Sequence, residues 1–376
     1  MSAQRAELSF EVRADSKLAG SPAVDKLRVY LTSLLAEGFP PSVSLTVVER
    51  GGAVLEAFGG YACVTGEPVP TTLETCYDLA SLTKVVCTVT LALLAVERGS
   101  FDLDDPVAKW LPRYPQKSTT LRHLFTHTAG LVDHRPFYMD LCGRDQIETA
   151  IYDEARGARP GDVVRYSDLG YMLLGWVLEA CYGLRLDEAF EAQVARPLGL
   201  TRARFRPVAV SDNGQDNRVP LPDLHRIAAT ELDGDQRRGP GLIWGEVHDG
   251  NAYALGGVSG HAGLFAPMAE LARFMREALV PGAVMSPGSV ALMGSRQAST
   301  GDDIRGIGWR LEPVGWGPWP RQTIWHTGFT GTSLLASPEL GLAVVLLTNS
   351  VHPHRRLADQ AAMRAQVHTL LAEALK

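Results

Sequence analysis

The stretch CYDLASLTKVVCTVTLALLAVERGS, residues 76–100, joins a serine and a lysine to a long apolar run. From Val85 to Val96 it is almost wholly apolar, which is typical of a helix buried on every side. One turn before this run stand Ser81 and Lys84, whose i, i+3 spacing places them on one helix face. A lysine here opposes the positive end of the helix and lies against apolar surroundings. The pair is therefore a candidate for chemistry.

Two interpretations of this pair remain open. Desolvation favours neutral Lys84, and a lysine of lowered pKa can take the proton of the Ser81 hydroxyl and release a nucleophile. The N–H groups at the helix start would then stabilise a developing oxyanion. In the other interpretation Ser81 only caps the helix, although a capping box would place Glu or Gln at position 84.

Two further motifs follow along the chain. Tyr166-Ser167-Asp168 stands at the entry of a predicted helix that runs to about residue 182 and ends at Gly183. Ser167 or Asp168 would cap this helix if the motif is structural, and Tyr166 would be a core aromatic residue. The third motif, His326-Thr327-Gly328, ends a predicted strand and would lay backbone along a substrate or simply form a turn.

The distribution of strands and helices predicts an α+β fold. A helix is expected over 21–38, a β-hairpin over 42–62, several strands between 306 and 350, and a final helix over 354–375. Tight turns between the strands indicate an antiparallel β-sheet flanked by the N- and C-terminal helices. Residues 1–85 with 266–376 are predicted to form this sheet lobe. Residues 86–265, with a long loop at 203–250, would form a helical lobe, and the active site would lie between the lobes.

Composition limits the function classes. The 376 residues carry a net charge of −6, which argues against nucleic acid or an anionic membrane as the main partner. No uncharged apolar run reaches the ~18 residues that a membrane span needs. The N-terminus has no apolar leader, and the five cysteines show no C-x-x-C spacing. These features predict a cytoplasmic protein, or a periplasmic or secreted one if an export signal was removed.

Taken together and in this order, SLTK, YSD and HTG resemble the motifs of the serine β-lactamase and penicillin-binding-protein superfamily. The similarity is greatest to the class C β-lactamase-related branch, which includes esterases, D-aminopeptidases and D,D-peptidases. The resemblance implies that Ser81 is the acylated nucleophile, Lys84 its partner base and Tyr166 the proton shuttle. It also implies that residues 326–328 line the substrate, and that the N–H groups of Ser81 and Phe329 form the oxyanion hole.

Two positions depart from the pattern of that superfamily. Asp168 stands where the superfamily usually has Asn, and His326 stands where penicillin-recognising members have Lys. The site is thereby more acidic, so we expect weak binding of carboxylate-bearing β-lactams. Asp168 would alternatively pair with Lys84, hold it protonated and shift the role of base toward Tyr166.

The motifs thus predict a serine hydrolase that forms an acyl-enzyme with a small-molecule ester, amide or peptide, including a cell-wall-derived peptide. A true β-lactamase or D,D-carboxypeptidase is the alternative within this class. Outside it, the alternative is a penicillin-binding-like protein that binds a ligand without catalysis. No cofactor is predicted, and the sequence does not determine the oligomeric state.

The stretch 246–265 supplies further candidates. We expect His248, Asp249 and Asn251 to border the site, with His261 beside them, although each histidine also fits an ordinary structural role. His123 and His127 have the i, i+4 spacing of a zinc helix, but the intervening LFT lacks the glutamate that such a helix uses. No metal is therefore predicted.

The motif analysis makes Ser81 the residue that a fluorophosphonate probe labels. Intact mass and peptide mapping should find one adduct on Ser81, and Ser81→Ala should abolish it. Labelling that persists in Ser81→Ala would place the nucleophile elsewhere.

Overall fold

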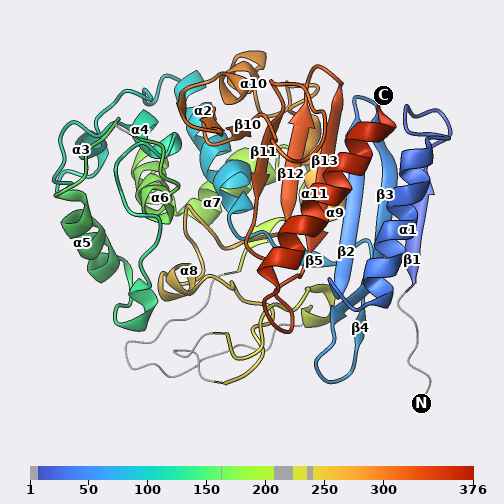
Figure 1. Cartoon of the computed structure of the whole chain (residues 1–376). Helices are drawn as coiled ribbons and strands as arrows, with labels where there is room; N and C mark the ends of the chain where they lie inside the picture. Colours follow the sequence, from blue (N-terminus) through green and yellow to red (C-terminus); the bar gives the residue numbers. More distant parts are fainter. Residues whose placement is uncertain (1–6, 162, 207–222, 235–239) are drawn as a thin grey trace.

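The computed structural model describes residues 7–161, 163–206, 223–234 and 240–376, and it confirms the predicted α+β fold. A ten-stranded antiparallel sheet has the strand order β1-β3-β2-β13-β12-β11-β10-β9-β8, with β4 paired to β3 (Figure 1). Its strands are β1 (Leu8–Val12), β2 (Ser42–Glu49), β3 (Gly52–Cys63), β4 (Val69–Pro70), β8 (Ala298–Thr300), β9 (Asp303–Arg305), β10 (Arg310–Leu311), β11 (Ile324–Thr327), β12 (Ser333–Ser337) and β13 (Leu342–Thr348).

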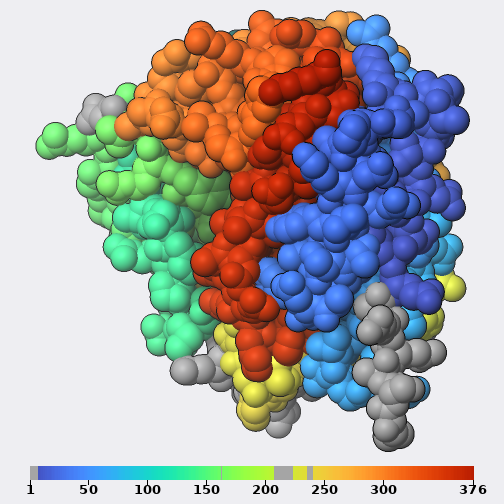
Figure 2. Space-filling model, turned by 45° about the vertical axis from the view of Figure 1, so that its right-hand side comes forward, coloured from blue at the N-terminus to red at the C-terminus, as the bar shows by residue number. Residues whose placement is uncertain are grey.

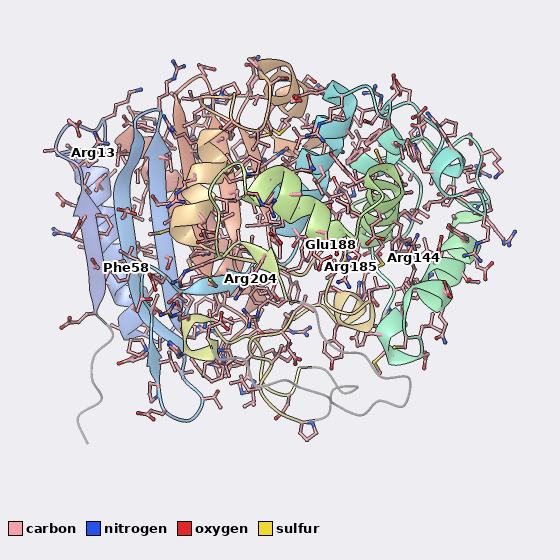
Figure 3. All side chains as sticks on the ribbon, turned by 180° about the vertical axis from the view of Figure 1, so that it is seen from behind. Arg13, Phe58, Arg144, Arg185, Glu188 and Arg204 are labelled. Atoms are coloured by element: carbon pink, nitrogen blue, oxygen red, sulfur yellow. The ribbon has the colours of Figure 1, made fainter. Side chains whose placement is uncertain are left out.

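The two terminal helices cover one face of this sheet. Figure 2 shows α1 (Pro22–Ala36) and α11 (Leu357–Ala374) side by side. Val43, Leu45 and Val47 of β2 belong to the core beneath them, because alternate residues of a strand point to one face. Helix α9 (Met268–Arg276) packs on the opposite face, which Figure 3 views from behind. The sheet is thus covered on both sides.

Most of the other helices lie in the part of the chain between β4 and β8. Arg144, Arg185 and Glu188 mark part of this region in Figure 3. The helices are α2 (Thr90–Glu97), α3 (Val107–Trp110), α4 (Leu121–Phe125), α5 (Arg144–Ala155), α6 (Asp168–Tyr182), α7 (Leu186–Phe190), α8 (Gly250–Ala254) and α10 (Pro287–Gly294), with the short turns η1 (Lys84–Val89), η2 (Phe137–Met139), η3 (Glu191–Ala195) and η4 (Leu224–Arg226).

The structure also contains a three-stranded sheet that the sequence did not predict. Its order is β5 (Cys76–Asp78), β7 (Leu264–Pro267) and β6 (Arg204–Phe205), and all its pairings are antiparallel. The predicted long loop 203–250 includes residues 207–222 and 235–239, which lie outside the described residues. The described remainder contributes β6 and η4.

The apolar stretch that follows Ser81 is buried as predicted, since every residue from Lys84 to Ala95 is inaccessible or nearly so. It differs from the prediction in its first turns. Residues 84–89 form the π-helical segment η1, and the α-helix α2 follows it. Such wide turns occur frequently at functional sites. Among the helices of the described residues, none is both long enough and apolar enough to cross a membrane.

Candidate active site

Ser81 stands where the chain leaves the small sheet and enters the buried helix. Ala80 adopts φ +47°, a left-handed conformation that is strained for a residue with a side chain. A hydrogen bond from the Ala80 N–H to Asp78 Oδ1, at 2.8 Å, holds this turn. Ser81 is partly exposed between the buried residues Ala80 and Leu82. The sharp turn therefore presents the serine at the protein surface.

Lys84 is fully buried, and its ammonium group donates to three acceptors. Its Nζ atom lies 3.0 Å from Ser81 Oγ, 2.8 Å from Asp168 Oδ1 and 3.1 Å from the His261 carbonyl oxygen. Burial, the largest single effect, lowers the pKa of Lys84, but the contacts with Asp168 and Tyr166 together outweigh it, and the net pKa is raised. The sequence left the sign of this shift open, and the raised pKa favours the alternative in which Asp168 holds Lys84 protonated.

Asp168 is the first residue of α6, where the positive end of the helix favours a carboxylate. Ser167 caps this helix by accepting from the Gly170 N–H at 3.3 Å. The second carboxylate oxygen of Asp168 lies 3.6 Å from Nδ1 of His134, a residue that no sequence motif indicated. Burial opposes ionisation of Asp168, but Lys84 and His134 together hold its pKa far below the usual range. The same contact raises the pKa of His134.

Tyr166 lies among cationic and imidazole groups. The Lys84 Nζ atom is 5.0 Å from the centre of its ring, and the rings of His127 and His326 are 4.5 and 6.1 Å away, centre to centre. Burial raises the pKa of Tyr166, and the nearby Lys84 ammonium offsets only part of this effect. The phenol is therefore neutral at pH 7. Arg305, which sequence analysis missed, places its guanidinium carbon 5.6 Å from the same ring.

His326 is the penultimate residue of β11, its ring is buried, and its Nδ1 donates to the Thr327 carbonyl oxygen at 2.9 Å. Burial, followed by the positive charges of Lys84 and Arg305, holds the pKa of His326 far below its usual value, so the ring is neutral. Arg305 is itself buried and ion-paired with Asp303 at 2.7 Å. The net charge counted from the three sequence motifs alone therefore omits Arg305, a cation that lies beside Tyr166.

The turn after β11 is fastened to the segment before Ser81. Thr330 Oγ1 donates to the Asp78 carbonyl oxygen at 2.7 Å, and Thr332 Oγ1 donates to the Leu79 carbonyl oxygen at 3.2 Å. Within the described part of the chain, the backbone N–H groups of Ser81 and Phe329 donate no hydrogen bond. Two free N–H groups on segments joined in this way have the character of an oxyanion hole.

The structure gives the candidates of the 246–265 stretch different positions. The ring of His248 stacks on that of Phe329, with 5.6 Å between centres, and its Nε2 lies 3.0 Å from Glu231 Oε2. Asp249 bonds His261 through Oδ1 and Nε2 at 2.9 Å, so it supports the segment whose carbonyl receives Lys84.

Asn251, His123 and His127 each form hydrogen bonds with backbone groups. The Asn251 amide accepts from the Tyr138 N–H at 3.1 Å and donates to the Arg135 carbonyl oxygen at 2.8 Å. His123 Nδ1 accepts from the Thr120 N–H, and His127 Nδ1 accepts from the Ser167 N–H, each at 3.0 Å. Across the residues that the structure describes, no group of three or more His, Cys, Asp or Glu side chains is placed to hold a metal ion.

Comparison with known proteins identifies the family. Residues 30–369 match the family model described as Beta-lactamase, so the chain belongs to the Beta-lactamase family of serine hydrolases. A relative from Escherichia coli (strain K12), named "Putative D-alanyl-D-alanine carboxypeptidase", is 31% identical over 366 residues, which cover 85% of this chain and 80% of that protein. The resemblance seen in the sequence is thereby confirmed.

Solved structures share the fold at lower identity. EstCE1, described as a hydrolase with promiscuous acyltransferase activity, aligns with a TM-score of 0.72 at 21% identity over 94% of this chain and 98% of its own. A class C beta lactamase from Rhodobacter sphaeroides aligns with a TM-score of 0.69 at 22% identity over 94% and 100% of the two chains.

The Lys84–Asp168 pair predicts a characteristic pH dependence of stability. The Lys84 contribution is present below the unfolded lysine pKa of about 10.4 and is lost as pH rises through the higher folded value. The Asp168 contribution is present above about pH 3.9 and is lost as pH falls through the lower folded value. The pair therefore adds a constant amount to the free energy of unfolding between about pH 5 and 9.

Asp168→Asn should cost about 3–5 kcal/mol at pH 7, because it leaves a buried cation without its counterion. Burial then lowers the pKa of Lys84, the unfolded state binds more protons, and stability should rise from pH 6 to 9. Urea unfolding at several pH values measures this. Asp153→Asn, at an exposed ion pair with Arg156, is the control and should change little. A pH profile of Asp168→Asn parallel to that of the wild type would contradict the assignment.

Proposed function

We propose that the protein is a serine hydrolase that forms an acyl-enzyme on Ser81 and acts on an ester or an amide. One observation carries this proposal: a fully buried lysine whose ammonium group donates to the hydroxyl of a partly exposed serine. A buried ammonium group is costly, and a purely structural serine does not need one. The family, with its serine hydrolase members, supports the same role.

The protonation states favour a relay of protons through Tyr166. Lys84 is held protonated by Asp168, so it does not act as a free base in the resting state. Tyr166 is a neutral phenol, since burial raises its pKa. In acylation, Ser81 Oγ would attack the carbonyl carbon, and its proton would pass to the Tyr166 oxygen as the phenolic proton passes to the departing oxygen or nitrogen, so the phenol stays neutral. The bond from the carbonyl carbon to that protonated atom would then break, and water would reverse the relay in deacylation.

The electrostatics of the site favour uncharged ester substrates over penicillins. His326, at the position of the usual lysine, is neutral and so offers no full positive charge to a substrate carboxylate. Arg305 lies nearby, but its charge is paired with Asp303. A second candidate function, D,D-carboxypeptidase, is favoured by the name of the E. coli relative and by the arginine beside Tyr166.

Tyr166→Phe should lower kcat for ester hydrolysis by about 10²–10⁴, because the ring and its packing remain while the relay is lost. Its melting temperature should change little. Tyr171→Phe is the matched control, since that ring lies 5.6 Å from Lys84 Nζ but its hydroxyl bonds the Phe125 carbonyl oxygen. Similar rates in the wild type and Tyr166→Phe, or equal losses in the two variants, would remove Tyr166 from the mechanism.

A panel of substrates tests the proposed specificity. The kcat/KM for p-nitrophenyl butyrate should exceed that for benzylpenicillin by at least about 100-fold, equivalent to about 2.7 kcal/mol of differential transition-state stabilisation. A D-Ala-D-Ala peptide belongs in the same panel. If that peptide is the best substrate, the carboxypeptidase function is correct. If benzylpenicillin is hydrolysed as well as the ester, the electrostatic argument fails.

A further inference from the structure

Helix α11 contacts the candidate oxyanion hole from the face of the sheet opposite to Ser81. Arg364 donates from its guanidinium group to the Gly328 carbonyl oxygen, and Gln360 Nε2 donates to the Phe329 carbonyl oxygen at 2.9 Å. The Gly331 N–H also donates to the Gly328 carbonyl, at 3.2 Å. Two consecutive carbonyl groups of the turn are therefore held by side chains of one helix.

Arg364 is an unusual residue for this position. Only 8% of it is exposed, and within the described part of the chain it forms no ion pair with a carboxylate. Burial lowers the pKa of Arg364 to about 10, so it stays charged at neutral pH at a cost in stability. A buried cation directed at a backbone carbonyl, with no counterion, contributes little to folding. Its contact with the peptide beside Phe329 suggests a role in the reaction.

Peptide geometry links that contact to the hole. The peptide between Gly328 and Phe329 is trans and planar, so its carbonyl oxygen and its N–H point in opposite directions. With the Gly328 oxygen fixed toward α11, the Phe329 N–H points away from α11. The bonds from Thr330 and Thr332 to residues 78 and 79 hold the same turn against the segment that carries Ser81.

We propose that Arg364 is a positioning residue that keeps the Phe329 N–H directed at the oxyanion formed when Ser81 is acylated. Its positive charge also polarises the Gly328–Phe329 peptide and strengthens the N–H as a donor. Gln360 restrains the next peptide without adding charge. The inference rests on the proposed acylation of Ser81, since it concerns the donor that stabilises the resulting tetrahedral intermediate.

The test compares Arg364→Met, Arg364→Lys and the control Arg356→Met, which alters a half-exposed arginine of the same region paired with Asp359. Each variant is assayed with a p-nitrophenyl ester and with the thionoester, in which sulfur replaces the carbonyl oxygen. Sulfur is too large and too weak an acceptor for a tightly set donor pair. The preference for the oxygen ester therefore reports how well the hole is formed.

Arg364→Met should lower kcat for the ester about 10–100-fold, less than the loss of a whole donor, with KM changed less than about threefold. Its preference for ester over thionoester should fall at least about tenfold, because the donor is no longer fixed. Arg364→Lys keeps the charge and a donor and should recover part of both quantities. Arg356→Met should match the wild type.

Either of two results would overturn the inference. One is an Arg364→Met variant with wild-type kcat and ester preference. The other is a variant whose kcat falls with its melting temperature while the ester preference stays unchanged, since that is the behaviour of a structural residue. A wild type that neither hydrolyses esters nor labels at Ser81 would overturn the proposed function and this inference together. An active wild type with an unaffected Arg364→Met overturns this inference alone.

Discussion

The hydrogen bonds of one buried ammonium group, that of Lys84, determine how the parts of the site meet. Its three acceptors come from three separate places in the chain: Ser81 before η1, Asp168 at the start of α6 and the His261 carbonyl before β7. Asp168 matters most to stability among them, because removing one partner of a buried ion pair costs about 3–5 kcal/mol. The close approach that this needs leaves no room at Gly260, where a Cβ atom would lie 2.2 Å from a carbonyl oxygen of α6. Helix α6 and the segment before β7 therefore pack closely around the Lys84 ammonium group, to which each supplies an acceptor.

The same pairing decides which group can move a proton. Asparagine, usual at the position of Asp168 in related proteins, would leave Lys84 subject to burial alone, with a lowered pKa. The carboxylate reverses this sign with the help of Tyr166, because the contacts of the ammonium group with both side chains together outweigh its desolvation. His134 contacts the other oxygen of the Asp168 carboxylate, and this contact raises the pKa of His134. Lys84, Asp168 and His134 thus lie in contact as cation, anion and imidazole, and the neutral Tyr166 beside them is the residue that we propose as the proton relay.

Sequence analysis found the parts of the site that depend on local spacing. The i, i+3 pair Ser81 and Lys84, the start of α6 and the end of β11 all carry short signals, and the order of the three motifs led to the fold. It missed His134, Arg305 and Arg364, because these residues reach the site through tertiary packing and have no fixed spacing to a motif. It missed the small sheet because β5, β6 and β7 are only two to four residues long. It left the sign of the Lys84 pKa shift open, because that sign depends on a competition between burial and a partner far along the chain.

The site lies between two buried cations that are treated differently by their surroundings. Lys84 is matched by the Asp168 carboxylate, whereas Arg364, behind the turn after β11, donates to the backbone carbonyl of Gly328. A carboxylate beside Arg364 would stabilise that arginine, but it would also compete for the guanidinium group and weaken its effect on the Gly328–Phe329 peptide. Because the Gly328 carbonyl is neutral, the positive charge of Arg364 is not cancelled and can polarise the Gly328–Phe329 peptide toward a developing anion. The two arrangements fit the proposed acylation in different ways. Lys84 with its counterion holds Ser81 in place, and Arg364 without a counterion favours negative charge on the carbonyl oxygen of the substrate.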